Sequence, residues 1–581
     1  WMGWIGRVDL SGGRAWREEL PPEARELLGG VGLGYWVCWR EVPAGTSAFD
    51  PRNALVLAAG PLTGTEAPGS ARLEVVGRSP QTHPRELFVQ SGLGGDLPVE
   101  LRGAGLDALV VTGQAPEPVF IYVHEQGIEI REAKELWGLD ALETQERVRE
   151  LLGDRSVRVL AIGPAGERLV RFACIVEGDG HAAGQGGFGA VMGSKRLKAI
   201  AVRGRAVPRV ASPGAFRDAC DRALRLLTMT HGNPKSAYWV RGVDALSTSL
   251  GQHWRRYDQL PLLAPGLLPF RRGKQGCCPL RCYDELEVPG VGRGIMMCVQ
   301  FYWCLVGRDG PVAFLAKDLA DRYGINVYEL YLMVPWLRAL AARGVLGERD
   351  LPFSAWPSER FVRALLSAIA RREGIGDLLA EGTARAAERL GVYEELCREE
   401  LVEWMALPPE RVVAFSSYGG HGFCGHYDPR NWLVDGLLWA THTRDPHNDH
   451  HNYVNLTFWS GLGLDEQRAI AAHAFGSPEA VYPPGRVRYS PEEARAAMLV
   501  QHQSAVKDSL VLCDWAWPMV VSPYPDRHPP YMGDLELEAQ LLSAATGWQG
   551  TREDLYGIGE RIVNLARLLL VRELGGADPA Q

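Results

Sequence analysis

The stretch LKAIAVRGRAVPRVASPGAFRDACDRALRLLTM, residues 197–229, contains a change of secondary-structure pattern. Residues 197–204 form a short apolar run that ends at a glycine, which is typical of a strand. Residues 214–229 instead carry apolar side chains at helical spacing. The proline-containing segment between these two runs predicts a boundary near residue 208, between a β-rich part and a helical part.

The residues before this boundary have the pattern of strands joined by turns. Short β-branched-rich runs bounded by glycine or proline predict strands at 54–60, 71–77, 108–113, 119–125 and 157–163. The segment 139–153 differs, because Leu142, Val148 and Leu151 recur at helical spacing and Gly153 predicts the helix end.

The residues after the boundary are mainly helical by period and composition. Helices are predicted within 214–229, 326–344, 359–374, 376–391, 535–547 and 554–574. We therefore expect an α+β fold, with a β-rich N-terminal domain at 1–208 and two mainly α-helical domains at 209–410 and 411–581.

The composition is that of a globular protein. The 581 residues are 46% hydrophobic and 23% charged, with a net charge of −8. This charge gives no sign of nucleic-acid binding, and no apolar run approaches the length of a membrane span. The start lacks the pattern of a secretory signal, and eleven cysteines are too few for a disulfide scaffold. We expect reduced thiols and a cytoplasmic location.

Three cysteines lie close together in KQGCCPLRC, at Cys277, Cys278 and Cys282, and Cys513 follows much later in DSLVLC. Four thiolates are the usual ligands of a [4Fe–4S] cluster. Zinc takes the same donors, but the CC-x3-C spacing matches zinc sites poorly. Buried thiols that happen to be neighbours are the third alternative. The spacing favours iron–sulfur over zinc without deciding between them.

Glycine-rich turns form the second group of candidates. HAAGQGGFG (181–189) contains Gly184, Gly186 and Gly187, and SGLGG (91–95) ends in Gly94 and Gly95. Glycines let the backbone approach a ligand, and successive amides can bind an anion. The pattern matches neither a Walker loop nor a dinucleotide fingerprint. Purely structural turns are the alternative reading.

Two further segments share a sequence pattern: DRYGIN (321–326) and DSLVLC (508–513). Each begins with an aspartate and places a short turn three residues later. An aspartate beside turn amides can hold the edge of an amino-pyrimidine by pairing donors with acceptors. Taken singly, each segment favours an ordinary helix end.

Together, these segments resemble the aldehyde ferredoxin oxidoreductase family, whose members are tungsten- or molybdenum-pterin enzymes with one [4Fe–4S] cluster. The similarity runs in order through MGWIGRVDLSGG, GPLTGTEAPGSAR, IGPAGE, GGFGAVMGSKRLKAIAVRG, CPLRC and DSLVLC, and it covers essentially the whole chain. It implies that the β-rich domain is a base for two pterins, with the two helical domains above it.

The resemblance also assigns residues to the cofactors. Arg72 would lie between a pterin and the cluster, and a magnesium ion would bridge the pterin phosphates. The residues implied at the pterins are Arg72, Gly94, Gly95, Gly184, Gly186, Gly187, Asp321, Gly324, Asn326, Asp508 and Leu512.

The cluster ligands depart from the family pattern at one position. Cys278, Cys282 and Cys513 match three family cysteines, whereas the first ligand would fall at Gln275. Cys277 is the substitute that we expect.

The chain also departs from the family near the tungsten or molybdenum. Family aldehyde oxidoreductases carry a glutamate above the metal, but the corresponding segment here, GRGIMMCVQFYWC (292–304), has no carboxylate. Cys298 lies near that place, which resembles the branch that includes the tungsten-dependent benzoyl-CoA reductases, where a cysteine ligates the metal. A core thiol is the alternative reading of Cys298.

The histidine-rich segment 419–454 follows a family segment after which a catalytic histidine is expected. His447, His450 and His451 are the candidates, because a histidine can move the proton that accompanies a two-electron step. A separate metal site, or a plain surface or core role, is the alternative for each of them.

The resemblance implies an oxidoreductase that oxidises an aldehyde to a carboxylate and passes single electrons to ferredoxin or a ferredoxin-like subunit. Reduction of an aromatic or acyl-CoA type substrate is the alternative, favoured by Cys298 and the missing glutamate. A non-catalytic electron-transfer subunit is an alternative of another class, but such a subunit would need neither aspartate motif. A homo-oligomer or a larger complex is compatible with the family.

Overall fold

The computed structural model describes residues 1–178, 180–230, 268–273, 283–288, 290–295, 306, 309–392, 433–441, 451–454, 456–457, 460–483, 489–514, 517–522 and 524–576. Within these residues, no helix has the length and apolar character needed to cross a membrane.

The N-terminal part contains a mixed six-stranded sheet in the order β2-β1-β6-β3-β4-β5. β1 pairs in parallel with β6, and the other neighbours in this sheet are antiparallel. The strands are β1 (Trp4–Asp9), β2 (Arg14–Glu19), β3 (Leu55–Ala59), β4 (Arg72–Arg78), β5 (Phe88–Gly94) and β6 (Ala108–Thr112).

A second six-stranded sheet has the order β11-β10-β9-β12-β7-β8. Its strands are β7 (Val119–His124), β8 (Gly127–Glu132), β9 (Arg158–Ala161), β10 (Ile175–Glu177), β11 (His181–Ala183) and β12 (Leu197–Arg203). The two sheets share one hydrophobic core, in which Leu57 and Val75 of the first cluster with Leu160 and Ile200 of the second. Burial of these side chains is the main force that holds the two sheets together.

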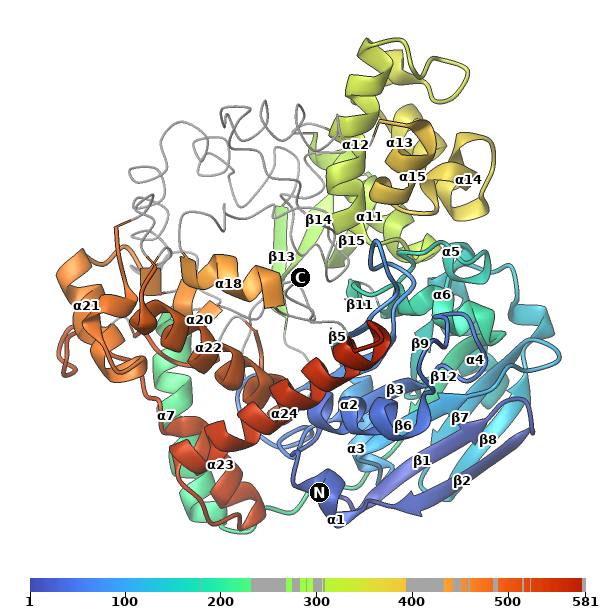
Figure 1. Ribbon diagram of the computed structural model, residues 1–581. Helices are drawn as coiled ribbons and strands as arrows, with labels where there is room; N and C mark the ends of the chain where they lie inside the picture. Colours follow the sequence, from blue (N-terminus) through green and yellow to red (C-terminus); the bar gives the residue numbers. More distant parts are fainter. Residues whose placement is uncertain are drawn as a thin grey trace.

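Helices cover the outer faces of the two sheets (Figure 1). The first sheet packs against α2 (Gly30–Glu41), α22 (Pro491–Leu510) and α24 (Arg552–Glu573). The second packs against α4 (Ala141–Leu152), which ends at the left-handed Gly153 as the sequence predicts. The C-terminal helices therefore lie directly on the N-terminal sheet.

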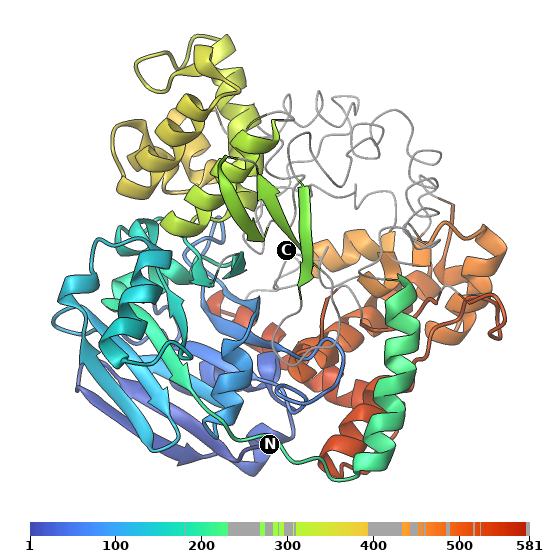
Figure 2. The ribbon, with the colours of Figure 1, turned by 180° about the vertical axis from the view of Figure 1, so that it is seen from behind.

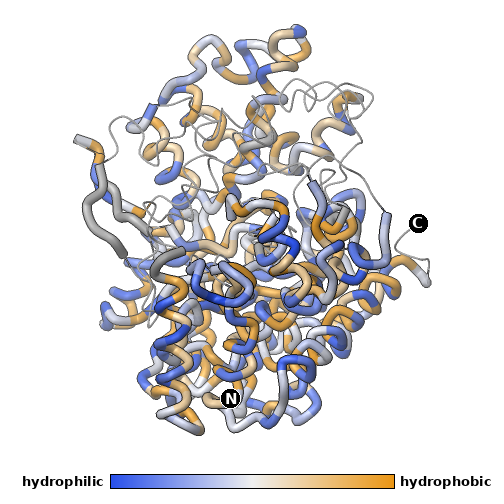
Figure 3. Tube along the Cα trace, turned by 90° about the vertical axis from the view of Figure 1, so that its left-hand side faces the viewer, coloured by the Kyte–Doolittle hydropathy of each residue, from blue (hydrophilic) through white to orange (hydrophobic). Residues whose placement is uncertain are grey.

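The middle of the chain forms a helical cluster, and its core also includes residues of the N-terminal part such as Phe172 and Ala190. Its helices are α11 (Gly310–Tyr323), α12 (Val327–Ala342), α13 (Glu359–Arg371), α14 (Ile375–Leu379) and α15 (Thr383–Leu390). In α13, apolar residues at helical spacing, such as Phe361, Leu365 and Ile369, are buried. Figure 3 shows the same alternation of hydrophobic and hydrophilic residues along the helices.

Four more helices complete the C-terminal part of the described chain: α18 (Leu433–Thr441), α20 (His451–Val454), α21 (Leu464–Ala474) and α23 (Leu537–Thr546). The helix α7 (Pro213–Thr230) follows the N-terminal sheets in sequence but lies beside α23 (Figure 2). Phe216 of α7 and Leu541 of α23 belong to one core cluster. The domain boundaries expected at 208 and 410 stay a prediction.

Short elements connect these layers. They are α1 (Pro22–Arg25), α3 (Leu97–Gly103), α5 (Pro164–Glu167) and α6 (Phe188–Ser194), with a small sheet of β13 (Leu268–Gly273), β14 (Tyr283–Val288) and β15 (Gly292–Ile295).

The strands expected from the sequence are present as β3, β4, β6, β7, β9 and β12. The α+β fold class is confirmed: mixed sheets form the N-terminal part, and helices dominate the rest of the described chain.

Candidate cofactor site

The two aspartate motifs end their helices in the same way. Asp321 lies near the end of α11 and is followed three residues later by Gly324, which is left-handed at φ 72°. Asp508 lies near the end of α22 and is followed three residues later by Val511, which is left-handed at φ 57°. In each motif, the residue after the left-handed one is Ile325 or Leu512. Its backbone amide donates a hydrogen bond to the carbonyl five residues earlier. The two motifs are therefore matched helix C-caps.

The first motif is fixed to the second sheet by backbone hydrogen bonds. The amide of Cys174 donates to the carbonyl of Gly324 at 2.8 Å, and the amide of Asn326 donates to Phe172 at 3.2 Å. Asn326 also caps α12, because its side-chain oxygen accepts from the Tyr328 amide at 2.9 Å. The end of α11 is thus held at the edge of the β-rich part.

Burial raises the pKa of the Asp321 carboxyl, and the nearby Lys317 ammonium opposes that shift. The Lys317 Nζ lies 3.1 Å from Asp321 Oδ2. The carboxyl therefore lies in a protected position near the sheet, where it can act as a hydrogen-bonding group.

The second motif packs against glycines of the N-terminal part. A Cβ on Gly30 would lie 2.0 Å from the Asp508 carbonyl oxygen, and a Cβ on Gly60 would lie 2.2 Å from the Leu510 carbonyl oxygen. Any larger residue at these positions would push the end of α22 away. These glycines thus explain why Asp508 can sit so close to the first sheet.

A row of buried charges, which we call the charge bridge, joins the second motif to β4. It consists of Arg72, Asp514, Lys507 and Asp508. Arg72 Nη2 lies 3.4 Å from Asp514 Oδ2, Lys507 Nζ lies 2.6 Å from Asp514 Oδ1, and Lys507 Nζ lies 3.1 Å from Asp508 Oδ1. Lys507 and Asp508 are each only 1% exposed at the side chain. Sequence reasoning identified Arg72 and Asp508 but missed the two residues that connect them.

The charge bridge continues into a polar pocket. Gln90 of β5 donates to Asp508 Oδ2 at 3.1 Å, and the Tyr35 hydroxyl of α2 donates to the Gln90 side-chain oxygen. Gln90 and Tyr35 are both buried. No local pattern in the sequence signals either residue, because their partners lie far away along the chain.

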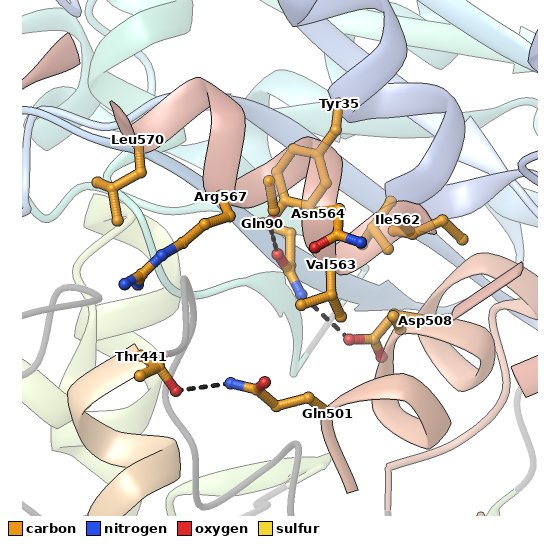
Figure 4. A pocket seen from close by; sticks show the side chains of 13 residues that line it. Tyr35, Gln90, Thr441, Gln501, Asp508, Ile562, Val563, Asn564, Arg567 and Leu570 are labelled. Atoms are coloured by element: carbon orange, nitrogen blue, oxygen red, sulfur yellow. Dashed lines mark hydrogen bonds between the residues drawn. The ribbon is translucent and has the colours of Figure 1, made fainter. Parts of the chain in front are cut away.

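The pocket has a volume of about 250 Å³ and lies between α2, α18, α22 and α24. Asp508 and Arg567 line opposite ends of it, and Gln501 donates to the Thr441 hydroxyl across its lower edge at 2.6 Å (Figure 4). Its lining residues are Val31, Tyr35, Gln90, Thr441, Gln501, Ala505, Asp508, Ile562, Val563, Asn564, Ala566, Arg567 and Leu570. Donors and acceptors thus face a compact space with an apolar wall, which suits a flat polar ring.

Cys513 follows the second motif and packs beside the loop before β4. Cys513 is half-buried. A Cβ on Gly69 would lie 3.0 Å from the Cys513 Cβ, and the Trp517 indole donates to the carbonyl of the adjacent Pro68 at 3.2 Å. Cys513 therefore lies next to Asp514, a member of the charge bridge. By contrast, burial raises the pKa of the thiols of Cys38 and Cys174, which are core residues.

Most of the other predicted metal ligands and catalytic residues lie outside the described residues. These are Cys277, Cys278, Cys282, Cys298, His447 and His450, and of His451 the structure describes the backbone in α20. The grouping of Cys277, Cys278 and Cys282 with Cys513 stays a prediction, as do the metal-binding role of Cys298 and the catalytic role of a histidine.

The predicted glycine positions fall into two kinds. A Cβ on Gly184 would meet no atom of the described residues within 4 Å, so within this part of the chain it faces open space. Gly187 is left-handed at φ 67°, and a Cβ there would lie 1.9 Å from the Arg171 carbonyl oxygen, while Gly186 is left-handed at φ 78°. Gly186 and Gly187 are thus required by the turn itself.

Gly95 makes room for a buried carboxyl that the sequence did not reveal. A Cβ on Gly95 would lie 1.9 Å from Glu177 Oε2, and Gly94 pairs with Arg72 between β4 and β5. Glu177 Oε1 accepts from the amides of Asp96 and Leu97 at 3.0 and 2.8 Å. Burial raises the pKa of Glu177 to about 8 against the effect of these two amides.

His181 stands near Arg72 and Asp96 at the same corner. Burial lowers the pKa of His181 to about 4, so its imidazole is neutral at physiological pH. The corner between β4, β5 and β11 therefore combines Arg72 with a neutral carboxyl and a neutral imidazole.

Comparison with known proteins identifies the family of this chain. The family model of the N-terminal domain of aldehyde ferredoxin oxidoreductase matches residues 5–204, and that of domains 2 and 3 matches residues 264–579. The chain belongs to the aldehyde ferredoxin oxidoreductase family. The resemblance seen in the sequence is thus confirmed, and the protein is an oxidoreductase of this type.

Tungsten-containing relatives of this aldehyde ferredoxin oxidoreductase family member match over nearly its full length. The tungsten-containing aldehyde ferredoxin oxidoreductase of Pyrococcus horikoshii is 31% identical over 100% of this chain and 90% of that protein. The enzyme of the same name from Pyrococcus furiosus is 32% identical over 99% of this chain and 89% of its own length. The aliphatic sulfonate oxidoreductase, WOR-like subunit, of Pyrococcus furiosus is 29% identical over 66% of each chain.

Among solved structures, a chain of the active site complex BamBC of benzoyl coenzyme A reductase superposes with a TM-score of 0.76. It is 24% identical, and the match covers 98% of this chain and 89% of that one. This likeness shows a shared fold.

Proposed function

We propose that this protein is a tungsten- or molybdenum-pterin oxidoreductase that couples two-electron chemistry on a substrate to one-electron transfer through a [4Fe–4S] cluster. The observation that carries the proposal is the pair of matched helix ends, Asp321 with Gly324 and Asp508 with Val511. Two equivalent aspartates at equivalent turns suit two copies of one cofactor.

The pocket beside Asp508 supports a pterin at the second motif. An aspartate accepts from ring and exocyclic N–H groups, while Gln90 and Asn564 supply an amide donor and acceptor each. Arg567, at the opposite end of this pocket, suits an anionic part of the same molecule. Such residues fit the cofactor that the family implies, and a bound metal–pterin group would supply the two-electron redox chemistry.

The packing around Gly95 supports a structural role for this glycine, which the resemblance to the family implied at the pterins. Among the described residues, Gly184 faces open space and suits close approach of a ligand, whereas the space beside Gly95 is filled by Glu177. We propose that Arg72 and Gly184 would face the pterins, and that a magnesium ion would bind together with them.

Cys513 supports the cluster, because it is a half-buried thiol that directly precedes Asp514, the carboxylate paired with Arg72. We propose Cys277, Cys278, Cys282 and Cys513 as its ligands. Cys298 is proposed as a ligand of tungsten or molybdenum, since a soft thiolate suits such a metal.

The proposed substrate is an aldehyde that is oxidised to a carboxylate, with a histidine among His447, His450 and His451 moving the proton. The alternative substrate is an aromatic or acyl-CoA type compound that is reduced. The segment 292–304, which has no carboxylate, favours this alternative, and the shared fold with a benzoyl coenzyme A reductase chain is compatible with it.

We further propose that the protein works in the cytoplasm with ferredoxin or a ferredoxin-like subunit. One relative is named a subunit and one solved relative is part of a complex, which supports assembly with a partner or with copies of itself.

Metal analysis of the purified protein tests the cofactors. We expect about four irons and one tungsten or molybdenum per chain. Iron without the heavier metal would support a non-catalytic electron carrier instead, and zinc alone would refute both functions. Anaerobic viologen assays with a panel of aldehydes then test the substrate, and failure with every aldehyde would favour the reductase.

Substitution of single cysteines tests the ligand set. Cys513→Ala should abolish the visible absorption of the cluster and the iron bound with it. Cys220→Ala is the matched control, because Cys220 is a buried core thiol of α7 whose pKa is raised by burial to about 12. Cys298→Ser should remove one sulfur neighbour from the X-ray absorption spectrum of the heavy metal. Retention of the cluster in Cys513→Ala would remove Cys513 from the ligands.

A further inference from the structure

Lys507 is a buried cation between two buried carboxylates. Its ammonium lies 2.6 Å from Asp514 Oδ1 and 3.1 Å from Asp508 Oδ1, and its side chain is 1% exposed. Burying an ammonium costs several kcal/mol unless it is paired and hydrogen-bonded. The two carboxylates supply that pairing, so the lysine and its partners hold one another in place.

Asp514 connects this lysine to a second cation. Its Oδ1 faces Lys507 and its Oδ2 lies 3.4 Å from Arg72 Nη2, so the carboxylate is shared between α22 and β4. Asp514 directly follows Cys513, the proposed cluster ligand, and Asp508 is the proposed pterin residue. The charge bridge therefore runs from one proposed cofactor site to the other.

Packing alone does not explain a lysine at this position. Replacing a buried ion pair by apolar residues of similar volume is often neutral or stabilising, so a buried pair is weak evidence of a contribution to stability. A buried charge does, however, act strongly on other charges nearby, because the surrounding dielectric is low. Adding an electron to a redox centre is a change of charge of this kind.

We propose that Lys507 is a positioning residue that also makes the cluster easier to reduce. It holds Asp508 towards one cofactor and Asp514 towards Arg72, and its positive charge stabilises the extra electron of a cluster bound through Cys513. The step concerned adds one electron to the cluster from an external reductant, and no bond forms or breaks. The inference rests on the proposed function, because it requires the cluster.

The test is a redox titration of the purified holoenzyme, followed by the electron paramagnetic resonance signal of the reduced cluster. Lys507→Gln removes the charge and should lower the equilibrium constant for reduction about tenfold, which is about 59 mV for one electron. Lys507→Arg keeps the charge and should stay close to the wild-type value. An unchanged potential in Lys507→Gln with a full complement of iron would overturn the proposal.

A second variant keeps the test valid if Lys507→Gln does not fold. Asp514→Asn removes a negative charge and leaves the lysine, so it should shift the potential in the opposite direction. Equal shifts of the same sign in the two variants, or no shift in either, would indicate a structural role and refute the electrostatic one.

The control for the underlying function is the wild-type protein itself. Absence of iron and of the cluster signal there would refute the proposed function as well as this inference. An intact wild-type cluster together with unshifted variants would refute this inference alone. Thermal unfolding of each variant separates a loss of stability from a change of potential.

Discussion

Replacing Glu177 by glutamine should make the stability of the protein less dependent on pH. Burial raises the pKa of this carboxyl from 4.5 to about 8 in the folded protein. The folded protein therefore keeps the proton up to about pH 8, whereas the unfolded chain loses it near its ordinary pKa. The stabilisation that this carboxyl contributes is present at low pH. It is lost as the pH rises from about 4.5 to about 8.

The size of the effect follows from the shift of the pKa. One pKa unit corresponds to about 1.4 kcal/mol, so the free energy of unfolding should fall by about 1.4 kcal/mol per pH unit, and by about 5 kcal/mol in total. Glutamine has no proton to lose, and its side-chain oxygen can accept from the same amides of Asp96 and Leu97. The variant should therefore gain stability relative to the wild type as the pH rises.

Urea unfolding followed by tryptophan fluorescence measures this difference between about pH 5 and about pH 9. Glu150→Gln is the control for the loss of one charge, because Glu150 is 61% exposed on α4. The difference between Glu177→Gln and the wild type should grow up to about pH 8 and then stay constant. A constant difference over the whole range would refute the reasoning, because it would mean that the two amides keep Glu177 ionised.

Outcomes are also expected for four further variants. Glu167→Gln should lower the free energy of unfolding by about 3–5 kcal/mol, because it removes the carboxylate 2.5 Å from the fully buried Lys198 ammonium; urea unfolding measures it. Gly187→Ala should destabilise the fold by more than about 2 kcal/mol in the same assay, whereas Gly184→Ala should keep stability and lower the pterin content. Gly30→Ala should displace the end of α22, so that metal analysis finds less bound tungsten or molybdenum. Normal pterin content in Gly184→Ala would remove that residue from the cofactor site.

The sequence predicted those strands whose own residues define them. β3, β6 and β12 are short, apolar and ended by glycine or polar residues, so their local pattern was sufficient. β2, with the sequence RAWREE, was not predicted, because it is an edge strand with mostly polar residues. The helical segment 376–391 is two helices, since Gly382 between them adopts φ 91°.

The site was predictable in part for a related reason. Each aspartate motif is a short continuous segment, so the residues that form the helix end are also neighbours in the sequence. The charge bridge is different, because Arg72 and Asp514 are 442 residues apart and pair through the packing of α22 on the first sheet. Lys507 directly precedes the second motif and Asp514 directly follows it. Charged residues next to a recognised motif are therefore the sequence signal that could have revealed these two residues.

The pocket beside Asp508 also constrains when the enzyme can become complete. Its walls come from α2 and β5 near the start of the chain, and from α24 near the end. The polypeptide must therefore be synthesised as far as α24 before both walls of the pocket exist. The pterin proposed at Asp508 would therefore find a complete pocket only after α24 has been synthesised and has packed against α2.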